Sequence, residues 1–324
     1  MDVLSQILAL MRIDGSVMAE IDCAGDWGID LETGDGIPFH YVIAGKCWFS
    51  DGERTTPLES GDLVAATHWP FHALASSPDQ PLIPIAQWIA ANGLPAWTGG
   101  TLDRPLVIKV GDRGDRVRIL SGVFTLKGSG AAMLLQQLPP ILHMRAQVAG
   151  LEPQLGTALD FVRHESDERH PGYIAVAERL MDLLFIQILR AAIRQPNVHV
   201  GLLAGLADDR LARALAVIHE DPARRWTVAD LALEACLSRT TFAERFRQTI
   251  GLSPIQYVNR WRMTVAEDLL IQPGMTIDAA RNRLGFVSSF AFARAFRAHS
   301  GVTPREFRRS SRNPIIRAGS DLTA

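Results

Sequence analysis

The spacing of hydrophobic and polar positions divides the chain into two parts. Between about residues 15 and 135, short apolar runs alternate with turns rich in glycine and proline, which is typical of a β-barrel or a β-sandwich. From about residue 140 onward, apolar positions recur every three or four residues, which predicts helices. We therefore expect an α+β chain with an N-terminal β-barrel, a helical connection and an all-α C-terminal domain.

A repeated segment predicts two copies of a small helical module in the C-terminal part. The hexapeptide Phe-Ala-Glu-Arg-Phe-Arg at 242–247 returns as Phe-Ala-Arg-Ala-Phe-Arg at 292–297. Each is followed by Gly-Leu-Ser-Pro or Gly-Val-Thr-Pro and then an aromatic residue, at a constant offset of 50 residues. Two copies are too few for a solenoid, so we expect a duplicated supersecondary unit.

Capping signals divide each copy into helix, tight turn and helix. In the first copy Thr227 and Asp230 form a capping box, Cys236 lies in the turn, and Ser238 caps a second helix that ends at Gly251. The second copy repeats these signals at Thr276, Gly285 and Ser288. Two helix-turn-helix motifs are therefore predicted.

The second helix of each copy is amphipathic, and its free face is a candidate contact surface. Phenylalanines four residues apart form the buried stripe. The candidate DNA-contacting residues are Arg239, Thr240, Ala243, Glu244 and Arg247 in the first copy and Ser289, Phe290, Arg294 and Arg297 in the second. A long helix from Pro254 to near Pro273 is a rigid spacer between the copies. Such a spacer lets both helices enter the major groove about 34 Å apart, one turn of the duplex.

Charge is distributed unevenly and supports a polyanionic partner for the C-terminal part. From Asp208 to the end there are 18 arginines, no lysine and 12 acidic residues, a net charge of +6, whereas residues 1–207 carry −8. The arginines occupy spaced helical positions, which favours a folded binding surface over a charged tail. A merely solvated face is the alternative.

Residues from about 208 to 310 closely resemble the DNA-binding domain of the AraC/XylS family of bacterial transcription regulators. The resemblance rests on motifs of both copies, which are Leu231-Ala232, Leu237-Ser238-Arg239, Gly251-Leu252-Ser253-Pro254, Leu284-Gly285-Phe286 and Gly301-Val302-Thr303-Pro304. Cys236 stands where the family commonly has glycine, and a left-handed backbone there would be strained. Arg281 and Leu284 also depart from the common pattern. The resemblance implies binding to double-stranded DNA in the major groove.

The residues of the free faces have alternative roles in such a complex. Arg294 is the best candidate for reading a guanine, while Arg247 and Arg297 fit phosphates better. Glu244 either accepts from cytosine N4 or pairs with a neighbouring arginine. Phe290 either contacts a thymine methyl or folds into the core.

The N-terminal part resembles, more loosely, the cupin sensor domain of one branch of these regulators. The similarity runs through Phe39-His40-Tyr41-Val42 and Gly61-Asp62-Leu63-Val64 to His72. Cupin enzymes hold a metal through an HxH pair, a glutamate and a later histidine, but here Val42 replaces the second histidine. His68 is a third nitrogen nearby. We expect no metal or other cofactor, and His40, Trp48 and His72 are candidates for lining an effector pocket.

The predicted helix with Leu180, Leu184 and Ile188 has two interpretations of equal weight. It packs on its own barrel, or it forms the interface of a homodimer, as the family resemblance implies. The expected domains are 1–140 for the sensor, 141–205 for the helical linker, 206–312 for DNA binding and 313–324 for a tail.

The predicted function is sequence-specific transcription regulation at bacterial promoters, modulated by an unidentified small molecule. The alternatives are a metal-dependent cupin enzyme fused to a DNA-binding domain, and a regulator without a ligand. No catalytic residues are proposed, and RNA polymerase is a further candidate partner. The apolar runs are too short for a membrane span and no signal peptide is recognised, which favours a cytoplasmic, nucleoid-associated protein. The three cysteines, Cys23, Cys47 and Cys236, show no CxxC spacing, which favours reduced thiols.

Overall fold

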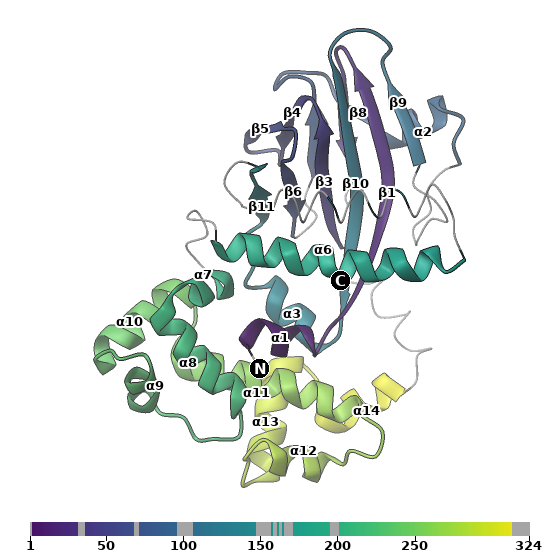
Figure 1. The fold of residues 1–324 in the computed structure, drawn as a ribbon. Helices are drawn as coiled ribbons and strands as arrows, with labels where there is room; N and C mark the ends of the chain where they lie inside the picture. Colours follow the sequence, from purple (N-terminus) through teal and green to yellow (C-terminus); the bar gives the residue numbers. More distant parts are fainter. Residues whose placement is uncertain are drawn as a thin grey trace. The chain divides into compact units, whose positions relative to one another are not determined.

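The computed structural model describes residues 2–31, 36–67, 71–95, 106–146, 157, 161, 164, 171–194 and 201–312 (Figure 1). The chain folds as two compact units, each built from segments distant in sequence. The helical unit comprises Met1–Arg12, Lys127–Leu138 and His199–Ala324, and the sheet unit comprises Ile13–Leu126 and Pro139–Val198. Within the described residues, no helix combines the length and apolar character needed to cross a membrane.

The sheet unit contains two facing sheets, so the expected cupin-like β domain is present, but its described strands do not close into one barrel. The six-stranded sheet has the order β11-β6-β3-β10-β1-β9, and the five-stranded sheet has the order β5-β4-β7-β2-β8. The first sheet consists of β1 (Arg12–Ala24), β3 (Ile37–Ala44), β6 (Leu63–Ala66), β9 (Leu106–Val110), β10 (Arg116–Lys127) and β11 (Ile141–Met144). The second consists of β2 (Gly28–Leu31), β4 (Lys46–Ser50), β5 (Thr55–Glu59), β7 (His72–Ala75) and β8 (Ile83–Pro84), which leads into helix α2 (Ile85–Ala91). Each sheet therefore keeps its own edge strands.

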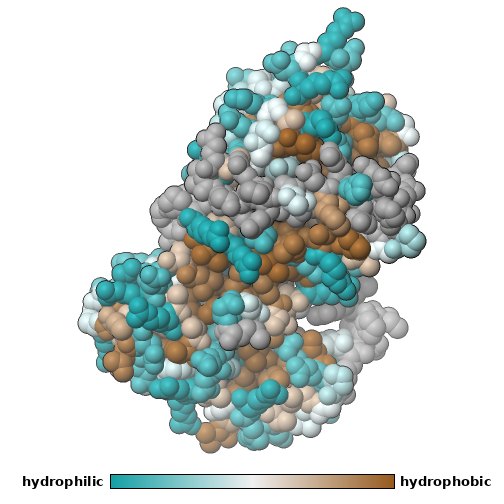
Figure 2. Space-filling model, in the orientation of Figure 1, coloured by the Kyte–Doolittle hydropathy of each residue, from teal (hydrophilic) through white to brown (hydrophobic). Residues whose placement is uncertain are grey.

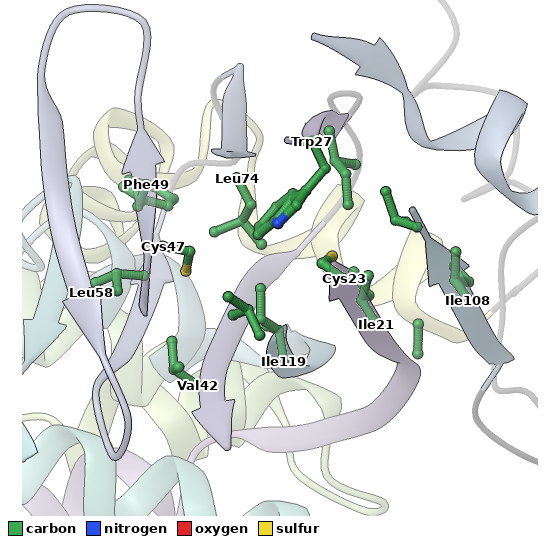
Figure 3. Packing of buried hydrophobic residues seen from close by; sticks show 14 of the residues in the cluster. Ile21, Cys23, Trp27, Val42, Cys47, Phe49, Leu58, Leu74, Ile108 and Ile119 are labelled. Atoms are coloured by element: carbon green, nitrogen blue, oxygen red, sulfur yellow. The ribbon is translucent and has the colours of Figure 1, made fainter. Parts of the chain in front are cut away.

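Alternating side chains of both sheets form the core between them. In β4, Cys47 and Phe49 are buried while the intervening Trp48 is half-buried, as expected for a strand with one face inward. Figure 3 shows Cys47 and Phe49 in one cluster with Leu74 of β7, Ile119 of β10 and Trp27, which lies just before β2. Burial of this apolar surface is the main stabilising contribution to the unit.

Helix α6 (Tyr173–Arg194) covers the other face of the six-stranded sheet and runs across its strands (Figure 1). The Phe124 ring lies 4.8 Å from that of Phe39 and 5.1 Å from that of Phe185 of the helix. A Cβ added at Gly15 would lie 2.7 Å from the Cβ of Met181, so only glycine permits this approach. The helix thus packs on its own sheet, as one of the two interpretations required.

The helical unit contains both predicted modules with the predicted caps. Thr227 and Asp230 form the capping box, Ser253 caps the linking helix with Pro254 at its first position, and Ser238, Thr276 and Ser288 cap their helices. The helices are α7 (Leu202–Ala207), α8 (Asp209–Glu220), α9 (Val228–Glu234), α10 (Arg239–Ile250), α11 (Pro254–Ile271), α12 (Ile277–Arg283), α13 (Ser289–Ser300) and α14 (Pro304–Arg312). The modules are α9 with α10 and α12 with α13.

Two helices from the N-terminal part of the sequence also belong to the helical unit. These are α1 (Val3–Leu8), which contacts α8, and α3 (Ser129–Leu135), which contacts α11. Thr264 of α11, itself buried, donates to the sulfur of Met133 at 3.8 Å. Ile7 and Leu134 are fully buried, and a Cβ at Gly130 would lie 2.6 Å from the Ile7 carbonyl oxygen.

The two compact units do not coincide with the expected domain ranges, which stay predictions. Residues 1–12 and 127–138 leave the segment 1–140 that we expected to form the sensor. The segment 141–205, expected to be helical, begins with β11 at the edge of the six-stranded sheet. The expected tail, 313–324, lies outside the described residues. Sequence periodicity detects elements, but it does not reveal which distant elements pack together.

Candidate nucleic-acid interface

The turn between α9 and α10 places the first candidate reading helix. The amide of Leu237 donates to the Ala232 carbonyl at 3.0 Å, and Cys236 has a φ of 52°. A left-handed conformation is costly for a residue with a side chain, so the strain expected at Cys236 is present. The guanidinium of Arg210 donates to the Cys236 carbonyl at 3.3 Å, which ties the turn to α8.

Helix α10 is fixed by its buried face and leaves the candidate residues outside. Phe242 and Phe246 are fully buried, and the Phe246 ring lies edge-on to Tyr257 of α11 at 5.7 Å. The five predicted contact residues lie on the other side, where Ala243 is half-buried and the rest, Arg239, Thr240, Glu244 and Arg247, are exposed. Another arginine of α10, Arg245, is instead bound to Asp208, its Nε donating to Oδ2 at 2.6 Å.

From the sequence, Glu244 either accepts from cytosine N4 or pairs with a neighbouring arginine, and the structure bears on the pairing. No ion pair among the described residues joins Glu244 to Arg239 or Arg247. Its side chain is exposed on the free face of α10. It therefore remains a candidate acceptor for a partner's donor group.

The second module is built on the same plan and has an additional brace. Gly285 ends its first helix with a φ of 72°, and a Cβ there would lie 2.3 Å from the Ala223 carbonyl oxygen. The Nη1 of Arg281 donates to the Val287 carbonyl at 3.3 Å and to the Ser289 hydroxyl at 3.2 Å. Arg281, which the sequence showed only as a departure from the family pattern, thus holds the start of α13.

Helix α13 exposes all four of its predicted contact residues, namely Ser289, Phe290, Arg294 and Arg297. Phe290 is 74% exposed, so it does not fold into the core, and the Arg294 guanidinium carbon lies 6.0 Å from its ring centroid. Val287, which sequence reasoning missed, is 77% exposed just before the helix. Its hydrophobicity and its position before the Ser288 cap were the available signals.

Helix α11 joins the two modules through a buried aromatic group and one arginine. The His219 ring stacks on Trp261 at 3.9 Å, and its Nε2 lies 2.7 Å from the Tyr257 hydroxyl. Burial lowers the pKa of His219 to about 3, so this ring is neutral at pH 7. Arg262 donates to the Pro222 carbonyl at 2.7 Å, and its guanidinium lies 5.3 Å from the ring of Phe286. Arg262 therefore connects the loop before α9, at Pro222, with the turn between α12 and α13, at Phe286.

The free faces of the two reading helices combine positive charge with exposure. They carry four exposed arginines, Arg239, Arg247, Arg294 and Arg297, and one exposed acid, Glu244. On the face of the helical unit in view, Figure 2 shows hydrophilic residues next to hydrophobic ones. Such a surface suits an anionic partner with some apolar groups.

In the sheet unit, two of the three candidate pocket residues come together. The Nε2 atoms of His40 and His72 are 3.0 Å apart, and the Nδ1 of His40 lies 2.8 Å from the Ser121 hydroxyl. His40, His72 and Ser121 are all buried, and burial holds the pKa of His40 well below its ordinary value. Trp48 does not join them, because it points to the opposite side of β4 from Phe49, which contacts His72.

The possible metal ligands of this region form only a partial set in the part of the chain that the structure describes. There, no group of three or more His, Cys, Asp and Glu side chains is placed to bind a metal. Val42, at the position of the missing second histidine, lies in the hydrophobic core. His68, the other candidate nitrogen, falls outside the described residues.

Comparisons with known proteins match both parts of the chain. A family model described as Cupin matches residues 2–194, and one described as Helix-turn-helix domain matches residues 231–310. A putative AraC-like transcription regulator of Streptomyces lividans is 31% identical over 97% of this chain and 100% of its own length. The transcriptional regulator AlkR of Acinetobacter baylyi is 28% identical over 96% and 100%. Among solved structures, the DNA-binding domain of AdpA in complex with a target DNA is 33% identical, with a TM-score of 0.32, over 33% of this chain and 97% of that one.

Proposed function

This chain belongs to the AraC-like transcription regulators that carry an N-terminal cupin domain, and we propose that it binds specific double-stranded DNA sites at bacterial promoters. The proposal rests chiefly on the two exposed reading helices, α10 and α13, which present four arginines from one folded unit. A protein with this role acts at the chromosome, so we place it in the cytoplasm with the nucleoid.

In the proposed complex each reading helix lies in the major groove. Arg294 donates to guanine O6 and N7, and Glu244 accepts from cytosine N4. Arg247 and Arg297, one turn further along their helices, contact phosphates and set the register. Arg239, Thr240, Ala243 and Ser289 complete the surface near the base edges. RNA polymerase is a further proposed partner, reached from the promoter-bound protein.

The proposed effector site is the interior of the sheet unit around His40, His72 and Ser121. Two imidazoles and a hydroxyl inside an apolar core are the few polar groups that orient a small molecule. Trp48, which points away from Phe49, is not part of this proposed site. A regulator that works without a ligand is the alternative. Equilibrium binding of candidate molecules to wild type and to Ser121→Ala separates the two.

We also propose that α6 joins two copies of the chain through its outer face. Its inner face is covered by its own sheet, but Val176 and Leu183 remain exposed at 37% and 44%. Replacing Leu183 by glutamate is expected to shift the protein from dimer to monomer in sedimentation experiments without unfolding it. The matched change Leu82→Glu, at a residue of the sheet unit that is 40% exposed and lies outside α6, is a control for added charge.

The central experiment is selection of random duplex DNA by the purified full-length protein, at two salt concentrations because phosphate contacts weaken steeply with salt. We expect enrichment of two short boxes about one helical turn apart. Arg294→Ala is expected to relax the preference at one base pair, at a cost of about 1–3 kcal/mol. The control Arg113→Ala removes an exposed arginine of the sheet unit and should change nothing. A protein that enriches no sequence at either salt concentration would overturn the proposal.

A further inference from the structure

Two large apolar side chains are exposed at the start of the second reading helix. Val287 is 77% exposed and Phe290 is 74% exposed. An apolar residue just before a helix cap often packs against the fourth helical residue, here Phe292. Val287 does not bury itself in this way. Exposed apolar pairs of this kind are costly in water, which makes them candidates for contact with a partner.

The exposed pair is held in place by the fold. Arg281 donates to the carbonyl oxygen of Val287 and to the hydroxyl of Ser289, so it fixes both ends of the short connection that carries the pair. The Ser288 hydroxyl accepts from the Ala291 amide at 3.4 Å, which starts the helix at a defined residue. A surface positioned by three hydrogen bonds presents Val287 and Phe290 in one geometry.

The charged neighbours of the pair restrict the kind of partner. Arg294 lies one turn beyond Phe290 with its guanidinium carbon 6.0 Å from the ring, and Arg297 follows one turn later. The partner therefore offers an apolar group directly beside acceptors or negative charge. In the major groove of DNA, thymine alone carries a methyl group, and guanine carries the acceptors that arginine binds.

The first module lacks an equivalent of this pair. At the 50-residue offset, Leu237 corresponds to Val287 and is half-buried, and Thr240 corresponds to Phe290. Glu244 takes the place of Arg294. The two reading helices therefore differ in chemistry, with a polar, mixed-charge first helix and an apolar, basic second helix.

We propose that Val287 and Phe290 read the 5-methyl group of a thymine that neighbours the guanine contacted by Arg294, with Arg281 as a positioning residue. The second DNA box is then defined by an adjacent thymine and guanine, whereas the first box is read by polar groups. This inference rests on the proposed function, because it names the bases recognised by one of its two helices.

The test replaces single thymines of the selected site by deoxyuridine, which removes only the methyl group. Full-length wild type is expected to bind about fourfold more weakly when one particular thymine of the second box is replaced, because the burial of one methyl group is lost. Phe290→Ala is expected to lose most of the discrimination between the thymine and deoxyuridine sites, and the double variant Val287→Ala/Phe290→Ala is expected to lose all of it. Leu233→Ala removes a residue of equal exposure, 78%, on α9 and should keep the full discrimination.

The positioning role of Arg281 is tested by the same ratio. Arg281→Met should lower the preference for thymine over deoxyuridine, and Arg281→Lys, which keeps one donor, should restore part of it. Circular dichroism confirms that each variant is folded. A residue with a purely structural role would change affinity for both sites alike and leave the ratio unaltered.

The outcomes separate this inference from the proposed function. If wild type binds the selected site and no deoxyuridine replacement weakens binding, methyl reading is wrong while DNA recognition stands. If Phe290→Ala weakens binding to the thymine and deoxyuridine sites by the same factor, the preference for thymine is unchanged. The ring then acts as a wedge between bases, and methyl reading is again wrong. If no DNA sequence is selected at all, the proposed function itself fails.

Discussion

Replacing Cys236 by glycine is expected to stabilise the helical unit. Cys236 is exposed and has a φ of 52°, a conformation that costs an L-residue about 1–2 kcal/mol. Glycine avoids that cost but has more freedom in the unfolded chain, which removes about 0.5–1 kcal/mol. The thiol contact with Arg213 at 3.5 Å is on the surface and contributes little. The net expected gain is about 0.5–1 kcal/mol.

The gain is measurable by urea unfolding of the full-length protein, followed through the transition of the helical unit. The midpoint should move to higher urea while the slope m stays unchanged. Cys236→Ala is the matched control, because it removes the sulfur and keeps the Cβ responsible for the strain. If glycine destabilises the unit as much as alanine does, the backbone at this turn is not strained and the reasoning is refuted.

Three further predictions concern the helical unit. Burial lowers the pKa of His219 to about 3, so as the pH falls this histidine is protonated in the unfolded chain while it is still neutral in the folded protein. Between pH 7.5 and 5.5 its contribution to the free energy of unfolding should therefore fall by about 1.4 kcal/mol. His219→Phe should make the free energy of unfolding, measured by urea at each pH, less dependent on pH in this range. The same pH dependence in the variant as in wild type would contradict the assignment. Gly285→Ala should cost more than Gly301→Ala, which is expected to cost about 1 kcal/mol, because a Cβ at Gly285 would lie 2.3 Å from a carbonyl oxygen whereas Gly301 has open space; equal melting temperatures would refute this. Ile7→Ala, which empties a fully buried site of α1, should destabilise the same transition by about 2–5 kcal/mol, and a loss confined to the sheet unit would contradict the assignment of α1.

The helical modules could be predicted closely from the sequence because their signals are local. A capping box, an N-cap serine and a helix-ending glycine act within four residues, and Thr227, Ser238 and Gly251 all behave as predicted. The stripe of Phe242 and Phe246 fixes which face is buried, so the opposite face follows from helix geometry. The exposed face of α10 was therefore within reach of sequence reasoning.

The sheet unit was harder because strand pairing is nonlocal. The sequence indicated short strands, but it did not show that they form two sheets with separate edges. The side on which Trp48 points depends on the register of β4, which a pattern of five residues does not specify. The bracing role of Arg281 was also missed, because its partners Val287 and Ser289 lie across a turn.

The membership of α1 and α3 in the helical unit sets the order in which the protein can be completed during synthesis. The chain crosses between the two units at residues 12–13, 126–127, 138–139 and 198–199, so neither unit is one continuous stretch. Helix α1 leaves the ribosome some 200 residues before α8, which it contacts. The apolar side of α1, with Ile7, therefore lacks its packing partner α8 while the strands of the sheet unit are synthesised. The two helix-turn-helix modules are synthesised only after every described element of the sheet unit.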